Sequence, residues 1–173
     1  FTKKAIKESS NLFNFIVPKI IVSEVNEVEL IKLFTNAWRY IQFAAANEYF
    51  MICSDLGIDY EKIRKIMIQD YERARNIPKA GFAAGPCLYK DTLQLSHFYK
   101  NNFIFGNSAV KINDNFPKFI VKKLLSKYNL KKMKVGILGM AFKANIDDLR
   151  DSLSIKLEKI LSKYCSKVFC SDE

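Results

Sequence analysis

The chain has 173 residues, a formal net charge of +10 and 49% hydrophobic residues. That apolar share excludes a disordered tail, and the excess of Lys and Arg over Asp and Glu favours an anionic partner such as a nucleotide, a nucleic acid or a membrane surface. One histidine and four cysteines without a CxxC pair exclude the usual Cys/His zinc site. No apolar run is long enough to span a membrane and no signal peptide is visible, so we expect a cytoplasmic protein.

Helical periodicity dominates the first three quarters of the chain. The longest periodic segment runs from Glu27 to about Asp55, and at about 1.5 Å per residue it forms a helix of roughly 40 Å. Gly57 suits the end of this helix, and Asp59 suits the N-cap of the next one. The other expected elements are a helix over residues 4–16, a short buried strand at Lys19–Ser23, and helices around Leu88–Lys100 and Ser108–Tyr128.

The periodicity changes from helix to strand at Met133. The segment Lys134–Gly139 (KVGILG) is typical of a buried strand that enters a glycine turn, and it is followed by a helix pattern at Ser152–Tyr164 and a second strand at Lys167–Cys170. This β-α-β order opens a parallel sheet. We therefore predict a mainly α domain built on a long helix, followed by the truncated start of a Rossmann-like α/β domain.

The stretch Gly81–Asp91 (GFAAGPCLYKD) places a cysteine at the expected start of a helix. Cys87, Lys90 and Asp91 are spaced to lie on one helical face. The helix dipole and the lysine favour the nucleophilic thiolate, and the aspartate suits activation of a water molecule. The small residues before the cysteine allow a ligand to approach bare backbone N–H groups. A buried structural cysteine after a flexible loop is the alternative interpretation.

Two further groups of polar residues are candidates for a site. Lys32, Asn36 and Asn47 fall within an arc of about 60° on the long helix, which indicates a buried polar seam, or alternatively the solvent-facing side of an ordinary amphipathic helix. The loop Gly139–Ser152 follows a strand and carries two cations and several acids. Ligands of parallel sheets bind at such loops, although no GxGxxG fingerprint is present.

In this order and at this spacing, the three motifs resemble the UDP-glucose/GDP-mannose dehydrogenase family. The resemblance rests on Glu29–Asn36 continuing to Asn47-Glu48, on Gly85–Asp91, and on Gly139–Lys143 continuing to Asp147–Ser152. It covers nearly the whole chain. It implies an NAD-dependent enzyme that oxidises the C6 alcohol of a nucleotide sugar to a carboxylate, for the synthesis of polysaccharide precursors.

The resemblance also implies roles for individual residues. Cys87 would capture the aldehyde stage as a thiohemiacetal and then a thioester, and Asp91 would assist the water that hydrolyses it. Lys32 and Asn36 would stabilise the oxyanion and bind the sugar. Cys87 and Arg150 would contact the NAD. The other implied substrate contacts are Arg73 (toward the substrate of a second subunit, with Arg75 as the alternative), Pro78, Lys79, Ala80, Gly81, Phe82, Ala83, Ala84, Phe142 and Lys143.

The domain organisation implied by the resemblance is that of a fragment. Residues 1–26 would complete an absent N-terminal NAD-binding domain, residues 27–130 would form the central helical domain, and residues 131–173 would begin the nucleotide-sugar-binding domain. We expect a homodimer through the helix 27–55, no nucleic-acid or membrane partner, and no activity of the fragment alone.

The resemblance leaves the identity of the substrate sugar open, because Phe82 and Ala84 stand where glycines are common in the family. A UDP-linked 2-acetamido sugar is among the candidates. The alternative function is a non-catalytic helical binding or oligomerisation module whose cysteine is only structural.

Overall fold

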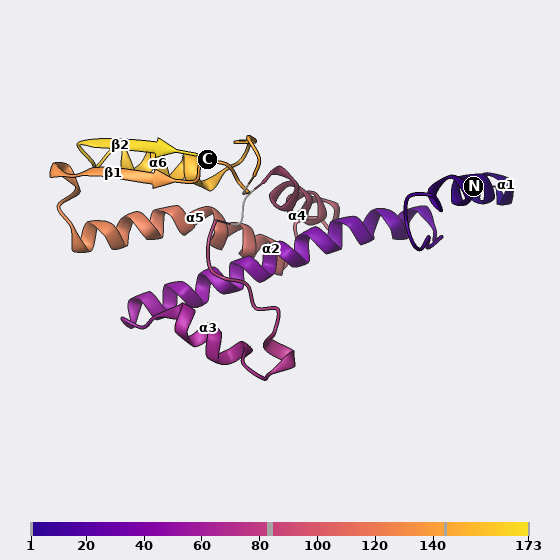
Figure 1. The fold of residues 1–173 in the computed structure, drawn as a ribbon, viewed down its shortest axis with the longest axis horizontal. Coiled ribbons are helices and arrows are strands. Elements are labelled where there is room, and N and C mark those ends of the chain that lie inside the picture. The colour runs from indigo at the N-terminus through magenta and orange to yellow at the C-terminus, as the bar shows by residue number, and fades with distance from the viewer. Residues whose placement is uncertain (1, 83–84, 144, 173) are drawn as a thin grey trace. The chain divides into compact units, whose positions relative to one another are not determined.

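The computed structural model describes residues 2–82, 85–143 and 145–172, and it divides into two compact units, Phe1–Lys32 and Leu33–Glu173 (Figure 1). The fold class is confirmed, since the described chain is mostly helical and carries a short parallel sheet near its C-terminal end. The elements, in chain order, are α1 (Lys3–Phe13), α2 (Val25–Asp55), α3 (Tyr60–Ile68), the 3-10 helix η1 (Glu72–Ala74), α4 (Pro86–Phe98), α5 (Ile104–Lys127), the 3-10 helix η2 (Leu130–Lys132), β1 (Lys134–Leu138), α6 (Leu153–Leu161) and β2 (Lys167–Ser171).

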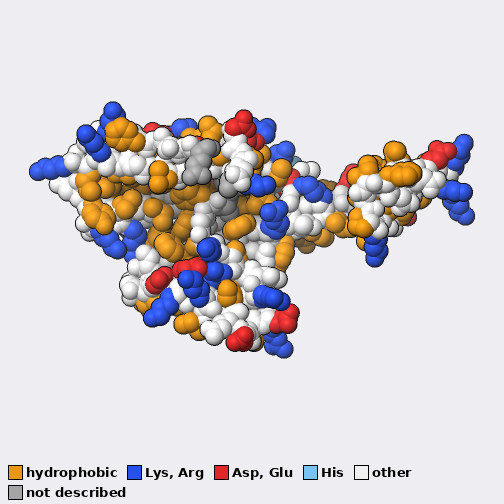
Figure 2. All heavy atoms as spheres, in the orientation of Figure 1, with side chains coloured by type: hydrophobic (Ala, Val, Ile, Leu, Met, Phe, Trp, Pro, Cys, Tyr) orange, Lys and Arg blue, Asp and Glu red, His pale blue; other side chains and the backbone are white. Residues whose placement is uncertain are grey.

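The N-terminal unit contains α1 and the first turns of α2. The side chain of Thr2 caps α1 by accepting a hydrogen bond from the Ala5 N–H at 3.2 Å. The prediction of a buried strand at Lys19–Ser23 was wrong, because this segment is irregular and mostly exposed. A strand needs a hydrogen-bonded neighbour, and no strand among the described residues pairs with this segment. Its apolar side chains therefore face solvent, as do many others in both units (Figure 2).

Helix α2 is the central element of the larger unit. Its end and the start of α3 follow the prediction, since Gly57 has a left-handed φ of +70° and Asp59 accepts a hydrogen bond from the Glu61 N–H at 2.9 Å. One face of α2 is buried against α4 and α5, where Tyr40, Ala44, Leu88 and Ala109 form a core cluster. The large side chains of Tyr40 and Leu88 fill this cluster together with the small Ala44 and Ala109.

The C-terminal part is the predicted β-α-β unit. Strands β1 and β2 pair in parallel, from Lys134 opposite Lys167 to Leu138 opposite Ser171. Helix α6 connects them and packs on α5, as Figure 1 shows. A second core cluster joins these elements; its members are Val121, Leu130, Ile137, Leu157 and Leu161. Among the described residues, each helix is too short or too polar to cross a lipid bilayer.

Candidate active site

A cavity of about 560 Å³ brings the three sequence motifs together. Its walls come from α2, from the loop before α4, from the first turn of α4 and from the loop after β1. The lining residues are Asn36, Arg39, Phe43, Phe82, Gly85, Pro86, Cys87, Leu88, Phe142, Lys143, Asp148 and Arg150. Segments that lie more than one hundred residues apart in the sequence thus share one concave surface, which is where ligands of proteins bind.

Cys87 lies in the first turn of α4 and its side chain is exposed toward this cavity. The helix begins at Pro86, as the sequence predicted, because proline has no N–H to leave unbonded at the first helical position. The alternative of a buried structural cysteine does not hold for Cys87, whereas Cys53 on α2 is buried. The thiol is therefore placed where a ligand in the cavity can reach it.

Gly85 caps α4 and lies directly beneath the ring of Phe142. Its backbone has φ +101° and ψ 143°, a region that is essentially restricted to glycine. A Cβ atom at this position would lie 2.7 Å from Cδ2 of Phe142. The glycine thus allows the loop after β1 to pack on the start of the cysteine helix.

Asp91 follows Cys87 by one helical turn and is buried. The amide nitrogen Nδ2 of Asn36 on α2 donates a hydrogen bond to Oδ2 of Asp91 at 2.5 Å. The expected polar seam is buried at Asn36 and Asn47, while Lys32 is exposed and belongs to the N-terminal unit. The structure therefore joins two predicted site residues, Asn36 and Asp91, by a direct contact.

The loop before α4 is held by side chains from two helices. Tyr60 Oη donates to the Pro78 carbonyl oxygen at 3.1 Å, and the Gly81 N–H donates to Asn47 Oδ1 at 2.8 Å. The ring of Phe82 packs edge-on against Phe116 with a centroid distance of 6.0 Å. Within the predicted substrate loop, Lys79 is exposed and Ala80 is half-buried, while Ala83 and Ala84 lie outside the described residues.

The loop after β1 contributes a paired charge to the cavity. Arg150 donates from Nη2 to Oδ2 of Asp148 at 2.7 Å and from Nε to Oδ1 at 3.0 Å. These hydrogen bonds lower the pKa of Asp148 to about 2 and raise the pKa of Arg150. Asp151 and Cys87 raise the pKa of Arg150 by smaller amounts. Lys143 is exposed at the same cavity. The loop therefore presents Lys143 and the Asp148–Arg150 ion pair at the cavity that contains the thiol.

Some predicted site residues lie outside the lining of this cavity, and six lining residues were not predicted. Of the predicted residues that the structure describes, those outside the lining are Lys32, Arg73, Pro78, Lys79, Ala80, Gly81 and Asp91. Arg73 and its alternative Arg75 are exposed at η1, outside the lining of this cavity. Sequence reasoning missed six lining residues as site residues: Arg39, Phe43, Gly85, Pro86, Leu88 and Asp148. The signal for the first two was their position on α2, three and seven residues after Asn36, on the same side of the helix. The signal for Asp148 was its place in the third motif.

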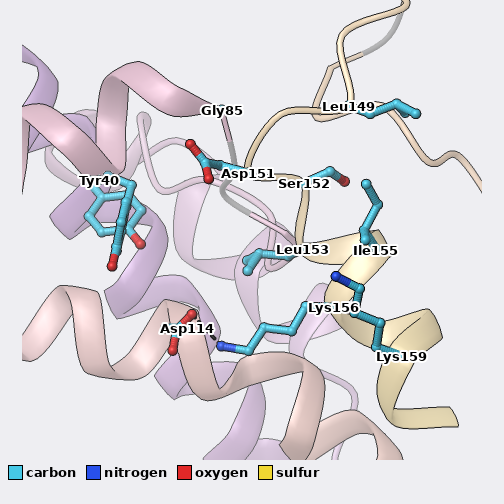
Figure 3. A pocket seen from close by; sticks show the side chains of 11 residues that line it. Tyr40, Gly85, Asp114, Leu149, Asp151, Ser152, Leu153, Ile155, Lys156 and Lys159 are labelled. Carbon is cyan, nitrogen blue, oxygen red and sulfur yellow. Dashed lines mark hydrogen bonds and ion pairs between the residues drawn. The ribbon is translucent and has the colours of Figure 1, made fainter.

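A second cavity, of about 480 Å³, adjoins the first at Gly85 (Figure 3). It is lined by side chains of α2, α4, α5 and α6, and an ion pair between Asp114 and Lys156 lies in its wall. Its lining includes Tyr40, Asp151 and Lys159 but no cysteine. The chemistry predicted from the sequence is therefore concentrated in the cavity that contains Cys87.

Comparison with protein families identifies the class of this chain. The model of the UDP-glucose/GDP-mannose dehydrogenase family, central domain, matches residues 26–115. The chain belongs to this family, as the resemblance of the three motifs had implied. The matched range contains α3, α4 and all but the first residue of α2, and it includes both Asn36 and Cys87.

Individual relatives are named as dehydrogenases of UDP-sugars. The chain is 30% identical over 163 residues to the UDP-N-acetyl-D-mannosamine dehydrogenase of Methanococcus maripaludis, which covers 92% of this chain and 38% of that protein. It is 27% identical over 175 residues to a UDP-glucose 6-dehydrogenase of Bacillus subtilis, covering 98% of this chain and 40% of that protein. The structure of the UDP-D-ManNAc dehydrogenase from Pyrococcus horikoshii superimposes with a TM-score of 0.85 at 25% identity, covering 98% of this chain and 42% of that one. The chain thus spans about two fifths of the length of these relatives.

Proposed function

We propose that this chain is the central catalytic part of an NAD-dependent nucleotide-sugar 6-dehydrogenase, which oxidises the C6 alcohol of a UDP-sugar to a uronic acid for polysaccharide precursors. The observation that carries the proposal is the exposed Cys87 in the first turn of α4, in one cavity with Asn36, Phe142 and Arg150. The relatives named for UDP-glucose and for UDP-N-acetyl-D-mannosamine support the substrate class. An exposed thiol in a lined cavity argues against a purely structural module.

The side chains of the cavity fit anionic ligands with flat rings. Arg39, Lys143 and Arg150 bring positive charge that suits a diphosphate, and Phe43, Phe82 and Phe142 offer apolar ring surface. When bound, NAD supplies the hydride acceptor for the two oxidations. In this proposal Arg150 and Cys87 contact the cofactor, while Phe142, Lys143 and the loop Pro78–Ala84 contact the nucleotide sugar.

The chemistry of the chain's own residues follows from their positions. The Cys87 thiolate adds to the C6 aldehyde carbon and forms a thiohemiacetal, whose oxyanion is stabilised by Lys32 and Asn36. The Asn36 amide has two N–H donors, and Asp91 accepts a hydrogen bond from this amide. In this proposal the second N–H donates to the substrate.

After oxidation, the same carbon is a thioester on Cys87. Asp91 then accepts a proton from a water molecule whose oxygen attacks the carbonyl carbon. The C–S bond breaks, and the thiolate and the free carboxylic acid are released. One cysteine thus holds the substrate between the aldehyde and the carboxylate.

We further propose a cytoplasmic homodimer that assembles along α2. Four large apolar side chains form an exposed stripe on this helix, the α2 stripe, within an arc of about 60°. Its members are Phe34, Trp38, Tyr49 and Ile52, which are 54%, 60%, 46% and 52% exposed. Contiguous exposed apolar surface of this kind marks an interaction site.

The proposed domains are 1–26, 27–130 and 131–173, with the fragment inactive alone and Arg73 reaching the substrate of the second subunit. The family model matches residues 26–115, most of which belong to the second proposed domain.

The function is tested with Cys87→Ser in the full-length protein that contains this chain. Carboxylate formation from UDP-glucose and UDP-N-acetylmannosamine is followed by NADH production. Cys170→Ser is the matched control, because Cys170 is also exposed but lies on β2. We expect loss of turnover by at least about a thousandfold for Cys87→Ser and none for Cys170→Ser. Equal turnover in both variants contradicts the proposal.

A further inference from the structure

A hydrogen-bonded relay of two fully buried asparagines connects three parts of the fold. The Gly81 N–H donates to Asn47 Oδ1 at 2.8 Å, and Asn47 Nδ2 donates to Asn113 Oδ1 at 2.9 Å. Asn113 Nδ2 in turn donates to the carbonyl oxygen of Tyr40 at 3.2 Å. Both asparagines have 0% of their surface exposed. The relay therefore joins the loop before α4 to α2 and α5.

The burial of both amides fixes their orientation. A buried polar group without a hydrogen bond costs on the order of 1–3 kcal/mol, so each amide is held by its partners. Rotating the Asn113 amide by half a turn would set its NH₂ against the NH₂ of Asn47, and its oxygen against the Tyr40 carbonyl. Only one arrangement of the two amides makes all three of these hydrogen bonds, and in that arrangement Asn47 Oδ1 faces the Gly81 amide.

The relay ends at the loop that borders the cavity. Gly81 immediately precedes Phe82, which lines the cavity, and the loop ends at Gly85 beneath Phe142. The loop is thus held at Gly81 through Asn47 and Asn113, and Phe142 packs on Gly85 at its C-terminal end. Asn113 itself is absent from the cavity lining and lies outside the three sequence motifs.

We propose that Asn113 is a positioning residue for the nucleotide-sugar loop, acting through Asn47 on the Gly81 amide. This inference rests on the proposed function, since it assigns a role in that same site. Asn113 contributes to binding of the nucleotide sugar and not to the bond-making steps at Cys87, because the relay meets the cavity at the loop before α4 and includes neither Cys87 nor Asp91.

The experiment compares Asn113→Ala with Asn115→Ala in the full-length protein. Asn115 lies two residues further on the same helix, is exposed, and donates only locally to the Lys111 carbonyl at 2.8 Å. Removing the relay weakens binding in the ground state and the transition state alike, which raises KM without lowering kcat. We expect Asn113→Ala to raise the KM for the UDP-sugar about tenfold, with kcat changed less than about threefold and the KM for NAD unchanged. Asn115→Ala leaves all three values unchanged.

Hydrogen–deuterium exchange of the peptide that covers residues 78–82 provides a readout that is independent of activity. In Asn113→Ala the Gly81 amide exchanges about tenfold faster, while Asn115→Ala exchanges as the unsubstituted protein does. Unchanged exchange at Gly81 in folded Asn113→Ala overturns the relay. If Asn113→Ala does not fold, Asn113→Ser carries the same test with the same two outcomes.

The two readouts separate this inference from the proposed function. A protein that oxidises no nucleotide sugar, yet shows faster exchange at Gly81 in Asn113→Ala, retains the relay and refutes the function. An active enzyme whose KM for the UDP-sugar and Gly81 exchange are both unaffected refutes the relay alone.

Discussion

The Nδ2 atom of Asn36 lies 2.5 Å from Oδ2 of Asp91, although 55 residues separate the two in the sequence. Both side chains are buried, with 8% and 7% of their surface exposed. This contact joins α2 to the cysteine helix α4 one turn after Cys87. Each of these two buried polar side chains therefore has a hydrogen-bond partner on the other helix.

Replacing Asn36 by Ala removes a donor from a buried carboxylate. We expect the free energy of unfolding to fall by about 1–3 kcal/mol, as measured by urea denaturation of the chain. Asn115→Ala is the control on an exposed asparagine and changes that free energy by less than about 0.5 kcal/mol. Equal losses in the two variants would show that the Asn36–Asp91 contact contributes nothing specific.

Replacing Gly85 by Ala combines backbone strain with a steric clash. The φ of +101° alone costs about 1–3 kcal/mol for a residue with a Cβ, and the ring of Phe142 must also move. Gly57→Ala is the matched control, since Gly57 also has a positive φ but no atom lies within 4 Å of its Cβ position. Denaturant unfolding should therefore show a larger loss for Gly85→Ala than for Gly57→Ala.

The double variant Gly85→Ala/Phe142→Ala separates the two causes. It relieves the clash but keeps the strained backbone, so its loss of stability is smaller than the sum of the two single losses. Strict additivity would show that the ring and the glycine do not interact.

The carboxyl group of Asp148 gives a defined pH dependence. Its folded-state pKa is lowered to about 2 by hydrogen bonds from Arg150, whereas an unfolded aspartate titrates near about 3.9. A depressed acid stabilises the fold above the unfolded pKa, and this contribution is lost as the pH falls from about 4 toward 2. In Arg150→Gln we expect the titration midpoint of Asp148, followed by carbon-13 NMR, to rise toward about 3.9. A midpoint that stays near 2 in that variant would show that a group other than Arg150 lowers the pKa of Asp148.

Placing a charge on the α2 stripe tests the proposed dimer. Trp38 is 60% exposed, and Trp38→Glu puts a carboxylate where the second copy would pack, so we expect a monomer in light scattering after size-exclusion chromatography. Phe98→Glu is the control, because Phe98 is 74% exposed on α4 and outside the stripe. Dimers of equal stability in both variants would exclude α2 as the interface.

Local sequence patterns predicted most of the fold, because the buried face of a helix or strand requires apolar residues at a regular spacing in the sequence. The long helix, the caps at Gly57 and Asp59, and the β-α-β unit were all found this way. The strand expected at Lys19–Ser23 was not, since a run of apolar residues looks alike in a buried strand and in an exposed connection.

The contacts within the site were harder to predict than its members. Asn36 and Asp91 were each identified by motif, but their hydrogen bond depends on how α2 packs against α4. Asn113 was missed because a polar residue in an amphipathic helix usually faces solvent, and its partner Asn47 is 66 residues away. Such pairings come from tertiary packing, which one sequence alone does not specify.

The packing of Phe142 on Gly85 has a consequence for protein engineering. The start of helix α4, which carries Cys87, is covered by Phe142. This residue belongs to the loop after β1, more than fifty residues later in the chain. A graft of residues 78–98 onto another scaffold would therefore leave an uncovered glycine beside the thiol. A transferable nucleophilic unit has to include the loop after β1, or a designed aromatic residue in its place.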